Sequence, residues 1–237
     1  MERRGILKTL VAGAISAWSA PFAASAAATQ GGAGTVERLD PALDALVAPG
    51  APIEKVAGGF RFTEGPLWRP DGTLWFSDVQ GNVVRSVTPQ GTVTVLIENA
   101  GGASNPPPDA FMGSNGMAEA PDGSVWMVQH GARRIVRVGP DRTLTPVVSA
   151  VEGKRFNSPN DLVFARDGAL YFTDPPYGLA KQDADPAKEL AFHGVYRFAN
   201  GRVQALVRDV SRPKEKPLPR VWRSDARRCQ HQSETAL

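Results

Sequence analysis

The chain has 237 residues, of which 42% are hydrophobic and 22% charged, with a formal net charge of +3 and one cysteine. These values are ordinary for a globular protein, and one cysteine excludes an internal disulfide framework and a cysteine-rich metal site. Residues 212–237 hold seven basic and three acidic residues, so this segment carries +4 and the remainder −1. A body so near neutrality lacks the basic surface that binds nucleic acid.

The N-terminus has the pattern of an export signal over residues 1–28. A basic start with Arg3-Arg4 precedes an apolar run and the small residues Ala24-Ser25-Ala26, which are typical of a cleavage site. The run is short for a membrane span, so we expect no stable span after signal removal; an uncleaved anchor is the alternative. The arginine pair resembles a twin-arginine signal, which favours an exported, periplasmic or secreted protein. Residues 29–52 form a lead-in segment.

Residues 53–211 repeat one unit. Each unit begins with an Asp-Gly pair, at Asp71-Gly72, Asp122-Gly123 and Asp167-Gly168, and such pairs suit a tight hairpin turn. A run centred on an aromatic residue, an alternating strand and a further β-rich segment follow each pair. Spacings of 51 and 45 residues, with four strand-sized pieces per unit, predict an all-β fold made of propeller blades. A sandwich of many short strands is the competing fold.

About three such units are present, whereas closure of a propeller takes at least four blades. The pattern stops after residue 211, and residues 212–237 form an aberrant basic tail, which we expect to be disordered. We therefore expect a partial propeller in a chain truncated at its C-terminal end, with strand edges left open.

Polar residues recur at the same phase of successive units, just before the innermost strand of each predicted blade. Glu64 precedes a Gly-Pro pair, Asn115 precedes Gly116, and Asn160 and Asp161 open the third unit. We place all four in connections between strands. Equivalent phases of successive blades meet at the central channel, where a carboxylate and several amide oxygens suit a hard cation such as Ca²⁺ or Mg²⁺. Taken singly, each has a simpler explanation, since Asn-Gly is a common turn dipeptide and Glu64 fits a solvated loop.

Three more residues lie near the predicted channel. His130 is expected at the same end of its blade as Asn115, and Asp174 and Tyr177 lie in the Pro-rich stretch "FTDPPYG". A lone histidine is more often hydrogen-bonded or at the surface than a catalytic base. Asp174 and Tyr177 are as well suited to shaping their loop as to contacting a substrate.

The motifs "FTEGPLW", "GSNGMA", "QHGARRIVR", "GKRFNSPNDLVF", "YFTDPPYG" and "KELAFHGVYRF" occur in this order within the repeats. Together they resemble the SMP-30/gluconolactonase family. The resemblance implies a six-bladed β-propeller with one divalent cation in its channel, Ca²⁺ first, with Mg²⁺, Zn²⁺ and Mn²⁺ as alternatives. It also implies that the substrate is a small sugar lactone, such as glucono-1,5-lactone, which is hydrolysed to the aldonic acid.

The resemblance also carries roles to individual residues. Glu64 matches the metal-binding glutamate of the family's Glu-Gly-Pro motif, and Asn160 matches an asparagine at the metal or substrate. Positions that line or support the channel are matched by Asn115, His130, Arg155, Asp161, Asp174 and Tyr177. In the implied reaction the cation stabilises the oxyanion that forms as water attacks the lactone carbonyl, and a carboxylate accepts the proton of that water.

Two ligands of the expected set are missing from the tail. Family members continue with Asn-Gly where this chain has Lys214, and nothing in residues 215–237 matches the aspartate that serves as ligand and base. The catalytic base is therefore unknown, a frame shift in the gene would explain the tail, and we expect the chain alone to bind metal weakly and hydrolyse little. The alternatives are a non-catalytic exported propeller that binds a sugar or a protein, and a phosphotriesterase-like hydrolase.

Overall fold

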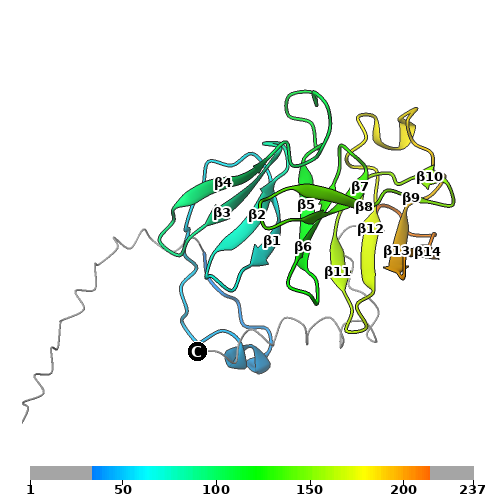
Figure 1. Ribbon diagram of the computed structural model, residues 1–237. Coiled ribbons are helices and arrows are strands. Elements are labelled where there is room, and N and C mark those ends of the chain that lie inside the picture. Colours follow the sequence, from blue (N-terminus) through cyan, green and yellow to red (C-terminus); the bar gives the residue numbers. More distant parts are fainter. Residues whose placement is uncertain (1–33, 214–237) are drawn as a thin grey trace, which may run out of the picture. The chain divides into compact units, whose positions relative to one another are not determined.

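The computed structural model describes residues 34–213 and divides the chain into two compact units, Met1–Lys55 and Val56–Leu237 (Figure 1). In the first unit the carboxylate of Asp40 caps the 3-10 helix η1 (Pro41–Ala45) by accepting a hydrogen bond from the amide of Ala42. None of the described helices has the length and apolar character needed to cross a membrane. The predicted export signal, and the predicted tail from residue 214 onward, lie outside the described residues.

The second unit contains three four-stranded antiparallel sheets, each ordered as in the sequence. The first sheet contains β1 (Thr63–Trp68), β2 (Leu74–Asp78), β3 (Val83–Val87) and β4 (Val93–Glu98). The second contains β5 (Ser114–Glu119), β6 (Val125–Gln129), β7 (Arg134–Val138) and β8 (Leu144–Val148). The third contains β11 (Leu162–Phe164), β12 (Leu170–Asp174), β13 (Gly194–Ala199) and β14 (Arg202–Val207).

Figure 1 shows the three sheets side by side, in the arrangement of successive propeller blades. A two-stranded sheet of β9 (Ala150–Val151) and β10 (Lys154–Arg155) follows the second blade. The short helix η2 (Gln182–Ala184) lies in the insertion between β12 and β13. The prediction of an all-β, partial propeller with three blades is confirmed for the described residues.

The predicted Asp-Gly turns join the first and second strands of every blade. In each, the aspartate carboxylate accepts a hydrogen bond from the amide two residues later, which is that of Thr73, Ser124 or Ala169, at 3.0 Å. Each glycine has a φ near +80°, a left-handed conformation that glycine adopts without a steric penalty. Local sequence alone therefore sets the turn between the first and second strands of each blade.

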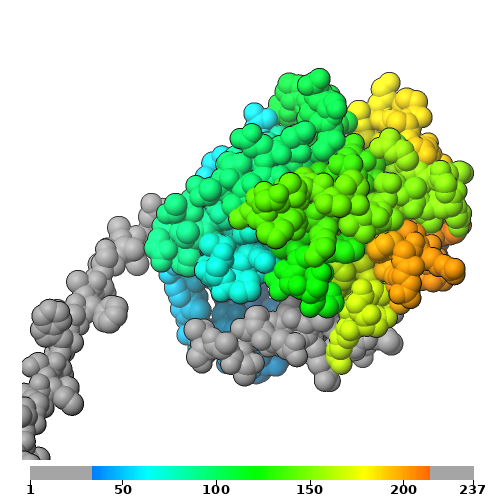
Figure 2. All heavy atoms as spheres, in the orientation of Figure 1, coloured from blue at the N-terminus to red at the C-terminus, as the bar shows by residue number. Residues whose placement is uncertain are grey.

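Two hydrophobic clusters lie between the blades, and the middle blade supplies both. Because neighbouring residues of a strand point to opposite faces, Met127 and Val136 enter the cluster shared with the first blade, while Val128 and Ile135 enter the cluster shared with the third. All four side chains are fully buried. In Figure 2 the middle blade, in green, accordingly lies between the cyan and the yellow-to-orange blades.

Candidate functional site

The innermost strands are β1, β5 and β11, with β5 between the other two. The predicted channel residues Glu64 and Asn115 lie on β1 and β5, and Asn160 lies just before β11. Hydrogen bonds join neighbouring blades at this level. The hydroxyl of Ser77, on β2, donates to the carbonyl oxygen of Asn115 at 2.7 Å, and the amide of Gly116 donates to the carbonyl oxygen of Asn160 at 2.9 Å. These contacts fix the backbones of Asn115 and Asn160 relative to the preceding blade.

The prediction that the channel residues lie in connections is wrong for Glu64 and Asn115. Each is the second residue of an innermost strand, β1 or β5. The pairing register slips by one residue at both places, between Glu64 and Leu67 and between Ser114 and Met117, so that the second slip includes Asn115. Such a bulge interrupts the alternation of inward and outward side chains, which hides the start of the strand in the sequence. Asn160 precedes β11, as predicted.

The glycines that follow Glu64 and Asn115 serve close packing between blades. A Cβ atom on Gly65 would lie 2.2 Å from the carbonyl oxygen of Asn115, and one on Gly116 would lie 2.9 Å from the carbonyl oxygen of Asn160. No side chain fits at either distance. The Asn-Gly dipeptide is therefore not a turn, and the simpler explanation for Asn115 does not hold. A glycine thus allows the same close backbone approach between the first and second blades and between the second and third.

The amide of Asn160 contacts the imidazole of His130. Both side chains are buried, at 2% and 1% exposure. Nδ1 of His130 lies 3.0 Å from the carbonyl oxygen of Phe111, and Nε2 lies 3.4 Å from Nδ2 of Asn160. The amide of His130 donates to the carbonyl oxygen of Gly113, next to Ser114 at the start of β5, so His130 and Asn115 lie at the same end of the middle blade, as predicted.

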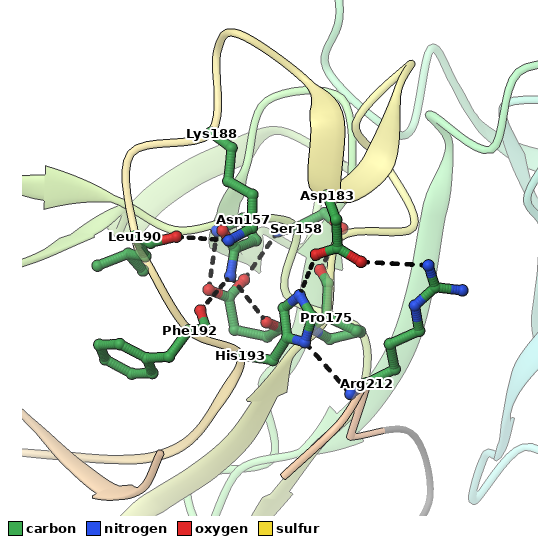
Figure 3. A network of polar contacts seen from close by, with 10 residues as sticks. Asn157, Ser158, Pro175, Asp183, Lys188, Leu190, Phe192, His193 and Arg212 are labelled. Carbon is green, nitrogen blue, oxygen red and sulfur yellow. Dashed lines mark hydrogen bonds and ion pairs between the residues drawn. The ribbon is translucent and has the colours of Figure 1, made fainter. Parts of the chain in front are cut away.

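Asp174, at the end of β12, holds the segment that leads to Asn160. Its two carboxylate oxygens accept hydrogen bonds from the amides of Asn157 and Ser158, both at 2.8 Å, and the carboxylate is fully buried. Burial raises the pKa of Asp174 to about 7, against the opposing effect of the two amide donors and the charge of Arg133. The hydroxyl of Ser158 donates to the carbonyl oxygen of Pro175 (Figure 3).

A buried arginine that the sequence interpretation missed supports the same segment. Arg133 is 4% exposed, and it donates from Nε to the carbonyl oxygen of Phe156 at 2.6 Å and from Nη1 to that of Ala187 at 2.8 Å. Arg155, on β10, is exposed instead, and its amide donates to the carboxylate of Glu189. Arg133 is one of the two arginines in the motif "QHGARR", but the sequence alone does not show which of them is buried.

The insertion of the third blade forms a second polar cluster (Figure 3). Nε2 of His193 lies 2.6 Å from Asp183, whose other carboxylate oxygen accepts a hydrogen bond from the Arg212 guanidinium at 3.1 Å. Partial burial works to raise the pKa of Asp183, but the Arg212 and His193 contacts outweigh it and hold that pKa below its usual value. Tyr177, in the same insertion, is half-buried.

The described residues contain no cluster of three or more His, Cys, Asp or Glu side chains that would hold a metal ion. The candidate donor set is instead the half-buried carboxylate of Glu64 with the amides of Asn115 and Asn160. Across the described residues, neither amide oxygen accepts a hydrogen bond, although Asn115 is only 6% exposed. Carboxylate and amide oxygens are the ligands that a hard cation takes.

Comparison of the chain with known proteins identifies its family. The family model described as the SMP-30/Gluconolactonase/LRE-like region matches residues 62–213. The chain belongs to the SMP-30/gluconolactonase/LRE-like family. A gluconolactonase of Zymomonas mobilis subsp. mobilis is 42% identical over 185 residues, which cover 76% of this chain and 52% of that protein.

Solved structures give the same result. A gluconolactonase from Xanthomonas campestris is 35% identical, with a TM-score of 0.56, over 65% of this chain and 50% of that one. A putative gluconolactonase is 31% identical, with a TM-score of 0.58, over 68% of this chain and 53% of that one. The chain thus spans about half the length of these members of the SMP-30/gluconolactonase/LRE-like family.

Proposed function

We propose that this chain serves the hydrolysis of a small sugar lactone to the aldonic acid, at a site that uses one divalent cation, Ca²⁺ before Mg²⁺, Zn²⁺ or Mn²⁺. The observation that carries the proposal is the placement of one carboxylate and two buried amides at the start of three neighbouring innermost strands, with Glu64 on β1, Asn115 on β5 and Asn160 just before β11. Membership of a family whose similar members include gluconolactonases supports the lactone as substrate. The N-terminal pattern supports export to the periplasm or the medium.

Glu64 and Asn160 would hold the cation, with Asn115 beside them. When bound, the cation supplies Lewis acidity at the lactone carbonyl. Glu64 contributes one negative charge and the two amides contribute none, so the set would leave a divalent ion with net positive charge. No described residue is assigned as the base that accepts the proton of the attacking water.

The test is hydrolysis of glucono-1,5-lactone by the purified chain, followed by acid release and corrected for the spontaneous rate. We expect a low enzymatic rate, because the chain alone is expected to bind the cation weakly, and we expect EDTA to abolish this rate and Ca²⁺ to restore it. Glu64→Gln should reduce the rate to the spontaneous one, because it removes the negative charge of the proposed donor set. Glu98→Gln, at an exposed residue of β4, is the matched control and should leave the rate unchanged.

Calcium binding is measured on the same variants by calorimetry. The proposal is wrong if Glu64→Gln hydrolyses the lactone like the unmodified chain and EDTA has no effect. A hydrolysis rate no greater than the spontaneous one at saturating Ca²⁺ would refute lactonase activity of this chain.

A further inference from the structure

We propose that His130 is a positioning residue, which turns the side-chain amide of Asn160 so that its oxygen faces the cation. The inference rests on the proposed function in one respect only, namely that Asn160 is a cation ligand. It gives His130 a role through Asn160, rather than the contact with substrate that its place near the channel suggests.

The surroundings of His130 exclude direct contact with a lactone. The side chain is 1% exposed. On one side, the backbone N–H of His130 donates to the carbonyl oxygen of Gly113 at 3.0 Å. On the other, Gly178 packs so closely that an added Cβ would lie 2.6 Å from Cβ of His130. The imidazole is therefore enclosed between the segment before β5 and the Pro-rich loop of the third blade.

The tautomer of His130 follows from its partner at Nδ1. A carbonyl oxygen only accepts hydrogen bonds, so the 3.0 Å contact with Phe111 requires a proton on Nδ1. In the neutral ring, Nε2 is then an acceptor. The group that faces Nε2 at 3.4 Å must be a donor, which is the NH₂ group of Asn160 rather than its oxygen.

This arrangement selects one of the two orientations of the Asn160 amide. With Nδ2 facing His130, the amide oxygen is the atom left to accept a ligand, and across the described residues no donor occupies it. In the flipped orientation the NH₂ group would face the cation, which it cannot ligate. A partner that orients a ligand in this way typically contributes about 10- to 100-fold to metal affinity.

Two substitutions at His130 distinguish the contact made by Nε2 from the contact made by Nδ1. His130→Gln places an amide near the position of Nε2, where its oxygen accepts from Asn160. His130→Asn places an amide near the position of Nδ1, where its nitrogen donates to Phe111, and leaves Asn160 without an acceptor. We expect calorimetry with Ca²⁺ to show an affinity within about 3-fold of the unmodified chain for the Gln variant and a loss of about 10- to 100-fold for the Asn variant.

A purely structural role predicts a different pattern. If His130 serves only to anchor the segment at Phe111, His130→Asn retains the affinity and His130→Gln loses it, which would overturn the proposal. As a further control, Asn160→Ala removes the group that His130 acts on, so adding His130→Asn should weaken Ca²⁺ binding no further. Additive losses in the double variant would contradict the inference.

A measurement without metal distinguishes failure of this inference from failure of the proposed function. Nitrogen-15 NMR of the cation-free chain reports which ring nitrogen of His130 carries the proton. In the neutral imidazole we expect the proton on Nδ1 and none on Nε2. A proton on Nε2 would refute the positioning role of His130, whatever the calcium affinity is. If the tautomer is as expected but no variant binds Ca²⁺, the proposed function fails. His130 would then still orient the Asn160 amide, but not toward a cation.

Discussion

Gly116→Ala tests the close approach of the second and third innermost strands. The added Cβ would lie 2.6 Å from Oδ1 of Asp161, 2.8 Å from Cα of Asp161 and 2.9 Å from the carbonyl oxygen of Asn160. Carbon atoms pack at about 3.5 Å or more, so β11 must move away from β5 by about 0.7 Å. The Gly116–Asn160 hydrogen bond, now 2.9 Å, would lengthen to about 3.6 Å, which is beyond hydrogen-bond range.

The expected cost combines two contributions. Overpacking of this kind costs about 1–3 kcal/mol, and loss of one backbone hydrogen bond adds about 1 kcal/mol. Urea unfolding followed by tryptophan fluorescence should therefore show a loss of about 2–4 kcal/mol in the free energy of unfolding, and calorimetry should show weaker Ca²⁺ binding, because Asn160 moves with β11.

Gly123→Ala is the control for Gly116→Ala. Gly123 has a φ of +78° with no atom within 4 Å of an added Cβ, so it bears only backbone strain of about 1–2 kcal/mol. The calcium affinity of the Gly123→Ala variant should equal that of the unmodified chain. A Gly116→Ala variant within about 0.5 kcal/mol of the unmodified chain would refute the close-packing argument, since that is the range of inconsequential surface substitutions.

Asp174 predicts a pH dependence: because burial raises its pKa to about 7, the folded chain binds a proton more tightly than the unfolded chain, and stability should fall as pH rises from about 4 to about 7. The urea midpoint should therefore be higher at pH 5 than at pH 8, and Asp174→Asn should flatten this difference; a midpoint that rises with pH over this window contradicts the prediction. Met127→Ala should cost about 2–5 kcal/mol, because the side chain is fully buried between two blades. Val95→Ala, at a residue that is 42% exposed, should cost less than about 1 kcal/mol, and equal losses in the two variants would argue against an interblade core.

The parts of the fold that depend on short-range sequence could be predicted. The Asp-Gly turns formed as expected because the aspartate and the glycine act within the turn itself. The repeat of these turns then gave the blades. The alternating strands, such as β7 with Ile135 and Val136 on opposite faces, were equally readable.

The parts of the site that depend on contacts between blades could not be predicted. Gly116 looks like a turn residue in the sequence, and only the position of Asn160 in the next blade explains it. Glu64 and Asn115 fall on bulges, which have no alternation to mark them. Arg133 is buried because carbonyl groups from two distant segments point at it, and nothing in its own neighbourhood distinguishes it from Arg134.

The shared position of the middle blade has a consequence for how the fold opens. Within residues 34–213 each of the two hydrophobic clusters joins one pair of neighbouring blades, so stability there is a chain of nearest-neighbour couplings rather than one common core. Either outer blade can detach by giving up one cluster, whereas release of the middle blade breaks both. The amide protons of β6 and β7 should thus be the last to exchange with solvent, and those of β4 and β14 should exchange through partial unfolding that leaves the rest of the fold intact.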